Sequence, residues 1–120
     1  AFSSDGRLMA TASADGTARV WDLGNQSLRT VLRGHDAAVN DITFTPDGSG
    51  VATLSNDDTV KLWDIGSGEA MITLPVGSGR VCRVSFCNEG NTLAASMIDG
   101  EQFAHIHLWD AEPVNPLLGR

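Results

Sequence analysis

The sequence lacks any run of 18 apolar residues, so it predicts no transmembrane helix and no membrane partner. Positive charge is also scarce, with eight Lys and Arg against fifteen Asp and Glu and a net charge of −7. Binding to a phosphate backbone needs clustered cations, so nucleic acid is not expected as a partner. No charged and then apolar leader opens the chain, and nothing in it points to secretion.

Cysteine is rare, and the two that occur, Cys82 and Cys87, are five residues apart on one extended segment. Their Cα atoms would then be about 16 Å apart, which is too far for a disulfide. Two free thiols favour a reducing compartment. We therefore expect a cytoplasmic protein.

Catalytic signatures are missing as well. The glycine pairs Gly66/Gly68 and Gly77/Gly79 are not followed by Gly-Lys-Ser/Thr or by a predicted helix, so they indicate loops and not phosphate cradles. The sequence has no kinase signature and no Gly-x-Ser-x-Gly elbow. We expect no enzymatic activity, no cofactor and no small-molecule substrate.

What the sequence does contain is an internal repeat. Trp-Asp occurs at 21–22, 63–64 and 109–110, at spacings of 42 and then 46 residues. The first two copies also share, at the same 42-residue offset, the pairs Phe2/Phe44, Asp5/Asp47, Gly6/Gly48, Ser13/Ser55, Asp15/Asp57, Thr17/Thr59 and Gly24/Gly66. The third copy keeps this offset up to Gly90 and then gains four residues before Trp109. A period of this length indicates supersecondary units that stack on one another.

The middle copy is complete and predicts four short strands. Residues rich in Val, Ile, Phe and Thr fall at 39–45, 50–55, 59–63 and 70–74. Thr45-Pro46-Asp47-Gly48 is typical of a tight turn between the first two strands. No segment has a helical period, so the fold class is all-β, built from antiparallel meanders. Apolar side chains on both faces of such a small sheet must pack on the neighbouring sheets.

These features resemble the WD40-repeat β-propeller family. The matching residues are Gly34-His35, Val39, Phe44 to Gly48, Ser55, Asp57, Thr59 and Leu62-Trp63-Asp64, and the resemblance extends over essentially all 120 residues. It implies consecutive four-stranded antiparallel blades: 1–33 lacking most of its inner strand, 34–75 complete, and 76–120 with a four-residue loop insertion.

The resemblance also implies a hydrogen-bonded tetrad inside each blade, made of His, Ser or Thr, Asp and Trp. Carried over, the complete set is His35, Ser55, Asp57 and Trp63. A buried indole N–H needs an acceptor, which a hydroxyl can supply. The first copy has only Ser13, Asp15 and Trp21. The third has Asp99 and Trp109, with Gly77 in the His position and Met97 in the Ser position.

Two further features have competing interpretations. His105 and His107 alternate on a predicted strand, so both imidazoles could face one metal ion, or they could belong to an outward polar face. We favour the polar face and expect no metal. The insertion places Glu101, Gln102 and Phe103 in a loop, where Phe103 either contacts a partner or folds onto its own blade.

The resemblance implies a non-enzymatic scaffold that binds other proteins or peptides on the propeller face. The alternative is a sensory or regulatory propeller attached to a signalling enzyme, a kinase or an ATPase, in a longer chain. Three blades cannot close a ring, and open sheet faces would leave apolar surface in water. We expect further blades from the same longer chain in preference to a ring formed by self-association.

Overall fold

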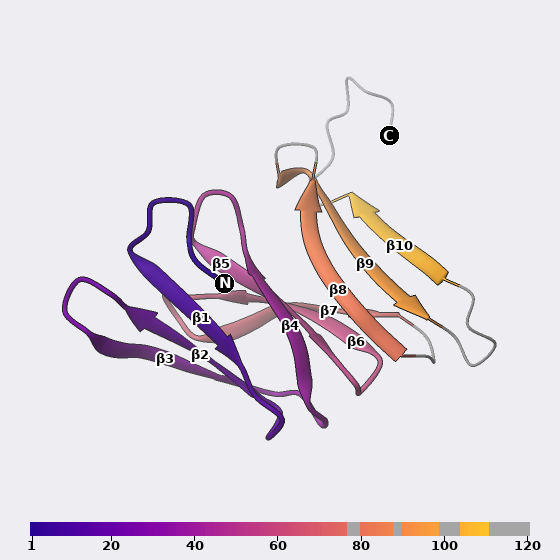
Figure 1. Cartoon of the computed structure of the whole chain (residues 1–120), viewed down its shortest axis with the longest axis horizontal. Helices are drawn as coiled ribbons and strands as arrows, with labels where there is room; N and C mark the ends of the chain where they lie inside the picture. The colour runs from indigo at the N-terminus through magenta and orange to yellow at the C-terminus, as the bar shows by residue number, and fades with distance from the viewer. Residues whose placement is uncertain (77–79, 88–89, 99–103, 111–120) are drawn as a thin grey trace.

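The computed structural model describes residues 1–76, 80–87, 90–98 and 104–110. In this part of the chain the fold is all-β, with strands in three antiparallel sheets (Figure 1). The first sheet is β1 (Leu8–Ala12), β2 (Thr17–Asp22) and β3 (Ser27–Arg33). The second is β4 (Val39–Phe44), β5 (Gly50–Ser55), β6 (Thr59–Asp64) and β7 (Glu69–Pro75). The third is β8 (Arg80–Cys87), β9 (Thr92–Ile98) and β10 (Ala104–Asp110).

The four strands of the middle sheet confirm the predicted meander, and each strand end lies within one residue of its predicted position. The turn between β4 and β5 closes with a 2.9 Å hydrogen bond from the Gly48 N–H to the Thr45 carbonyl. Gly48 has φ +75°, a left-handed conformation that a residue without Cβ adopts at little cost. Asp47 braces this turn by accepting hydrogen bonds from the side chains of Thr45 and Ser49.

The sheets pack face to face, and β5 lies at the centre of the packing. All six of its residues are buried, because other sheets cover both of its faces. Val51 belongs to a cluster shared with the first sheet: Ala10, Ala18, Val20, Leu32, Ile42, Phe44, Trp63 and Ile65. Ala52 and Leu54 belong to a cluster shared with the third: Val60, Val76, Val84, Leu93, Ala95 and Met97. The prediction that neighbouring sheets bury the apolar faces of a blade is confirmed for the middle sheet.

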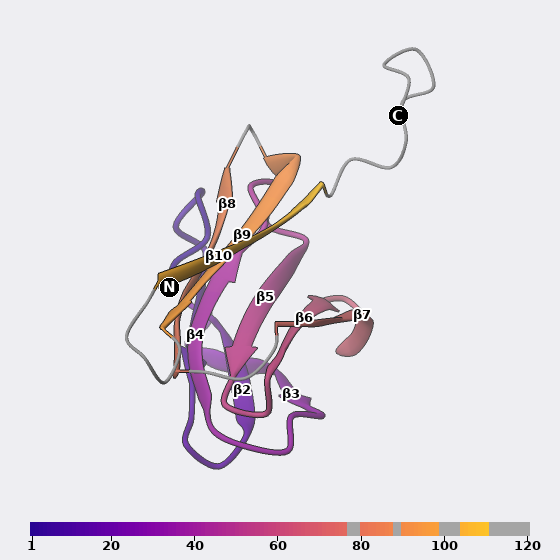
Figure 2. The ribbon, with the colours of Figure 1, turned by 90° about the vertical axis from the view of Figure 1, so that its right-hand side faces the viewer.

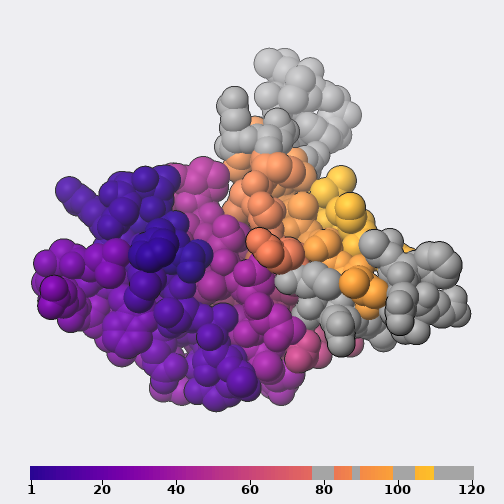
Figure 3. All heavy atoms as spheres, viewed as in Figure 1, coloured from indigo at the N-terminus to yellow at the C-terminus, as the bar shows by residue number. Residues whose placement is uncertain are grey.

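Contacts between the sheets run mainly through β1, β4, β5 and β8. Figure 2 views the molecule from the side of the third sheet, so that β8–β10 lie in front of β4–β7. In Figure 3 the atoms of the three sheets fill three adjoining zones of the surface. Backbone hydrogen bonding joins the first two sheets, with the Val39 N–H donating to the Ser13 carbonyl at 2.9 Å. The described residues form no closed ring.

A β-bulge recurs beside the tryptophan of the first two repeats. Leu62 pairs with Ile72 but Trp63 pairs with Ala70, so Met71 is an extra residue with no partner in the register. In the first repeat the same shift leaves Arg29 as the extra residue. A bulge redirects the side chain of the extra residue. The sequence analysis did not predict these bulges.

The first sheet has only a remnant of an inner strand, an isolated bridge between Phe2 and Met9. At the other end, Ile106 and Leu108 of β10 are 69% and 64% exposed. Their equivalents in the middle sheet are Val60, which is fully buried at 0%, and Leu62, which is half-buried. Within the described ranges no helix is long and apolar enough to span a membrane.

Candidate functional site

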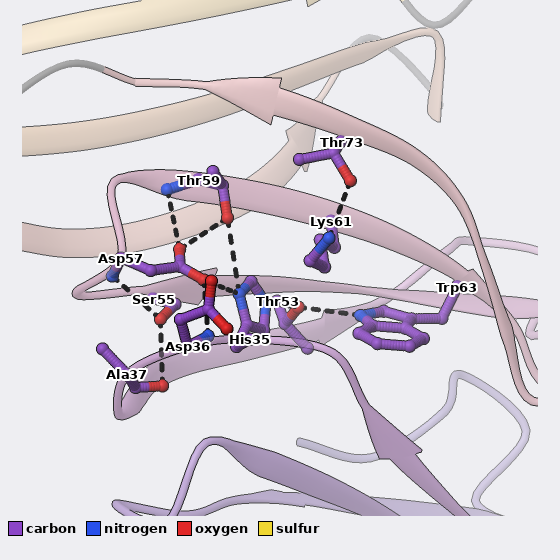
Figure 4. A network of polar contacts seen from close by, with 10 residues as sticks. All are labelled: His35, Asp36, Ala37, Thr53, Ser55, Asp57, Thr59, Lys61, Trp63 and Thr73. Atoms are coloured by element: carbon purple, nitrogen blue, oxygen red, sulfur yellow. Dashed lines mark hydrogen bonds and ion pairs between the residues drawn. The ribbon is translucent and has the colours of Figure 1, made fainter.

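A buried network of polar side chains lies in the middle repeat (Figure 4). His35 comes from the connection between β3 and β4, and Thr53 from the centre of β5. Asp57 comes from the turn between β5 and β6, and Trp63 from β6. The antiparallel meander therefore brings together four residues from across 29 positions of the sequence.

The hydrogen bonds of the network form a single directed chain. The indole N–H of Trp63 donates to Thr53 Oγ1 at 2.8 Å. Thr53 Oγ1 is 2.6 Å from His35 Nε2, and His35 Nδ1 is 2.9 Å from Asp57 Oδ2. The ionised Asp57 carboxylate can only accept, so Nδ1–H donates to it, and in a neutral imidazole Nε2 then accepts the hydroxyl proton of Thr53. This order requires the neutral, Nδ1-protonated tautomer of His35.

The network is shielded from solvent. The side chain of His35 is 1% exposed and that of Asp57 is 11% exposed. Trp63 is 1% exposed and Thr53 is fully buried. In the described part of the chain no buried side-chain nitrogen or oxygen lacks a hydrogen-bond partner. Such a satisfied network rigidifies a sheet, whereas an enzyme nucleophile must be reachable by substrate.

Burial and hydrogen bonding set the charges of the network. Burial lowers the pKa of His35 below its ordinary value of 6.5, against the opposing hydrogen bond and charge of Asp57. Burial alone would raise the pKa of Asp57, but hydrogen bonds from the Thr59 hydroxyl, the Asp36 N–H and His35 outweigh it and hold that pKa at about 2. At neutral pH the pair is a neutral imidazole beside a carboxylate, in agreement with the tautomer.

The prediction that Ser55 supplies the hydroxyl of the tetrad is wrong, because Thr53 does so. Trp63 is opposite Val51 in the register. Thr53 is the next residue of β5 on the same face as Val51, and the Trp63 indole reaches it. Ser55 is a further two residues along, about 6.6 Å away. Its hydroxyl instead donates to the Ala37 carbonyl at 3.1 Å and accepts the Asp57 N–H at 3.1 Å. Ser55 therefore fixes the turn that carries Asp57.

The first repeat requires the same correction. The Trp21 indole N–H donates to Thr11 Oγ1 at 3.1 Å, and not to Ser13. Ser13 Oγ accepts the Asp15 N–H, as Ser55 does for Asp57. Asp15 accepts hydrogen bonds from the side chain and the N–H of Thr17, which lower its pKa to about 2. Thr11 and Thr53 are 42 residues apart, but so are Ser13 and Ser55, so the repeat spacing alone does not identify the hydroxyl.

In the third repeat the residue equivalent to Thr53 is Ala95, which is buried and has no hydroxyl. The sequence analysis had placed this substitution at Met97, which is also buried but corresponds to Ser55. Trp109 stacks on His107, with ring centroids 5.7 Å apart and planes inclined by 13°. Asp99 lies outside the described residues. Trp109 is therefore held by aromatic stacking and apolar packing, whereas Trp63 is held by a network of hydrogen bonds.

The remaining candidates are the histidines of β10 and the residues of the inserted loop. His105 and His107 lie two positions apart on β10, but no group of three or more His, Cys, Asp or Glu in the described residues is arranged to hold a metal ion. The loop residues Glu101, Gln102 and Phe103, proposed as partner contacts, lie outside the described residues. They remain a prediction.

The family of the chain follows from a comparison with protein-family models. The WD40 model, described as WD domain, G-beta repeat, matches residues 1–22 and 26–64, which is just over half of the chain. A search of curated proteins found no match. The chain belongs to the WD40 repeat family, and its stacked antiparallel sheets are blades of a β-propeller. WD40 repeats generally act as protein-interaction modules and are typically not enzymes.

Proposed function

We propose that this chain is a sector of a WD40 propeller that acts as a non-enzymatic scaffold for other proteins or peptides. The observation that carries the proposal is that the buried polar side chains of the middle repeat bond to one another and to the local turn. His35, Thr53 and Asp57 include the residue types of a hydrolytic triad, but they are buried and their hydrogen bonds end on Trp63 and on the local turn. They hold the blade together and leave the exposed turns and sheet edges for binding.

Binding can be tested with the full chain as bait. A partner recovered from its own cells would be purified and titrated by calorimetry, and we expect saturable binding with no turnover of substrate. Failure of every purified candidate to bind saturably would contradict the scaffold function. Kinase or ATPase activity in the same polypeptide that changes when the partner binds would instead support the regulatory alternative.

We also propose that further blades cover the outer face of β10. Ile106 and Leu108 are mostly exposed, while the equivalent positions of the middle sheet, Val60 and Leu62, pack against the third sheet. Exposing an apolar sheet face to water is costly, and a following repeat would bury it in the same way. Hydrogen exchange of the β10 amides tests this. Exchange in the longer protein should be slower than in the 120-residue chain, and equal rates would contradict the proposal.

A cytoplasmic location completes the proposal. Cys87 is an exposed free thiol, which a reducing compartment preserves. Labelling of Cys87 in intact cells by a membrane-permeant maleimide, but not by an impermeant one, is the expected result. Labelling by both reagents would contradict it.

A further inference from the structure

The surface is hollowed where the second and third sheets meet. A pocket of about 270 Å³ lies there, with apolar walls made by Pro46, Leu62, Met71 and Phe86. This is smaller than the roughly 300–1,000 Å³ of common small-molecule sites, so it suits a single side chain better than a cofactor. Gly90 also lines the pocket, and it lies so close to Pro46 that an added Cβ would be 2.8 Å from the proline ring.

The β-bulge places Met71 at this pocket. As the extra residue of β7 it has no partner in the register with β6, and it is 62% exposed. An exposed methionine at a concave apolar surface is costly to keep in water. Its flexible, polarisable side chain adapts readily to an apolar ligand.

The first repeat shows that the fold does not require an apolar pocket here. Its corresponding surface has Arg7 where the middle repeat has Ser49, and Arg29 where the middle repeat has Met71. Those arginines line a pocket together with Asp5 and Asp22. The same turn and the same bulge thus form with charged side chains, and the apolar character of the second pocket is particular to that repeat.

The carboxylate of Asp47 lies at the edge of the apolar pocket and can accept further hydrogen bonds. Asp47 is exposed, and the hydrogen bonds from Thr45 and Ser49 all end on its Oδ1. Among the described residues none is donated to Oδ2. The Ser49 N–H is the main cause that lowers the pKa of Asp47, so the carboxylate is charged at neutral pH. No Lys or Arg is among the described residues that line this pocket.

We propose that this pocket binds a partner protein through a leucine-sized side chain with an arginine or lysine next to it in sequence. The aliphatic group enters between Pro46, Met71 and Phe86, and the cation pairs with Asp47 Oδ2. The proposal rests on the scaffold function and specifies one of its contact sites.

Minimal peptides test the site without a known partner. The full chain, labelled with ¹³C at its methionine methyl groups, would be titrated with acetyl-Leu-Arg-amide, acetyl-Leu-Glu-amide and acetyl-Ala-Arg-amide. We expect Leu-Arg to shift the Met71 signal saturably, with the Met9 and Met97 signals unchanged. Leu-Glu should bind about two- to fivefold more weakly, the range of an exposed ion pair, and Ala-Arg should give no saturable shift.

Two matched variants complete the test. Met71→Arg introduces the residue that the first repeat has at this position, so the variant should fold. It should no longer bind acetyl-Leu-Arg-amide, as measured by calorimetry. Arg29→Met makes the reciprocal change and should leave Leu-Arg binding unaltered. Equal shifts from all three peptides, or unchanged binding in Met71→Arg, would overturn the proposal. A purified partner that still binds Met71→Arg would overturn the pocket while leaving the scaffold function intact.

Discussion

The carboxylate of Asp41 accepts the backbone N–H of Val84 at 2.9 Å, across the boundary between the middle and third sheets. Asp41 is on β4 and Val84 on β8, so one side chain fastens the neighbouring strands at the centre of the sheet packing. The guanidinium of Arg83 lies 4.0 Å from the same oxygen, but Arg83 is 83% exposed and its ion pair is screened by solvent. The neutral donor is therefore the important partner.

Replacing Asp41→Ala should lower the free energy of unfolding of the full chain by about 1–2 kcal/mol, because the N–H of the buried Val84 loses its acceptor. Urea denaturation measures this. Arg83→Ala is the control and should stay within about 0.5 kcal/mol. Equal effects of the two substitutions would show that the ion pair, and not the backbone bond, joins the sheets.

Removal of His35 tests the buried network as a whole. His35→Ala should cost about 1–3 kcal/mol, since Thr53 and Asp57 lose their partner inside the sheet. An unchanged urea midpoint, in a protein whose ring is complete, would rule out a stabilising role. Arg33→Ala, an exposed position two residues earlier, should leave the midpoint almost unaltered.

The identity of the hydroxyl can be tested separately. Thr53→Val keeps the shape of the side chain and removes the acceptor of the Trp63 indole N–H. Its indole ¹H–¹⁵N signal should move and its hydrogen exchange should accelerate, and Thr53→Ser should restore both. Ser55→Ala should leave that signal in place, because Ser55 bonds only to backbone groups. A displaced Trp63 signal in Ser55→Ala would reinstate Ser55 as the tetrad member.

Stability should also depend on pH through this network. The folded pKa of His35 is lowered, so between the folded pKa and the ordinary 6.5 the unfolded chain binds a proton that the folded chain does not. The free energy of unfolding should therefore fall as pH decreases below about 6.5. Asp57, with a pKa of about 2 against an ordinary 3.8, adds a second loss as pH falls from about 4 towards 2.

Chemical denaturation between pH 7.5 and 2 measures both steps. His35→Gln removes the first titration and should flatten the curve immediately below pH 6.5, while His105 and His107 remain in both proteins. A curve of unchanged slope in His35→Gln would assign the pH dependence to other groups.

Gly48 and Gly90 occupy equivalent turn positions 42 residues apart, which makes them a matched pair. Both have positive φ, +75° and +90°. An added Cβ at Gly48 meets nothing within 4 Å, whereas one at Gly90 would be 2.8 Å from Pro46. Gly48→Ala should cost about 1 kcal/mol from backbone strain, and Gly90→Ala about 1–3 kcal/mol more from overpacking. Equal melting temperatures for the two variants would show that the turns do not pack as described.

Sequence reasoning determined the fold well because the repeat constrains it twice over. The 42-residue spacing and the Thr45–Gly48 turn motif predicted the strands of the middle sheet to within one residue. The apolar residues of β5 occur on both of its faces and predicted burial by neighbouring sheets on both sides, which the two apolar clusters confirm.

The same reasoning chose the wrong hydroxyl for the tetrad. Thr53 and Ser55 lie on the same face of β5, and both have an equivalent at the 42-residue offset. Only the register, in which Trp63 pairs with Val51, decides which of them the indole reaches. The bulge at Met71 was missed for a related reason. No glycine or proline marks it, and it arises from how two strands pair rather than from either strand alone.

Because the bulge residue has no partner in the strand register, its position can vary from repeat to repeat. Arginine occupies this position in the first repeat and methionine in the second, and the surrounding sheet is built the same way in both. Substitution at this position changes the side chain on the surface and leaves the backbone hydrogen bonds of the sheet in place. A propeller of such repeats can diversify its binding preferences blade by blade, while selection for folding acts on other positions.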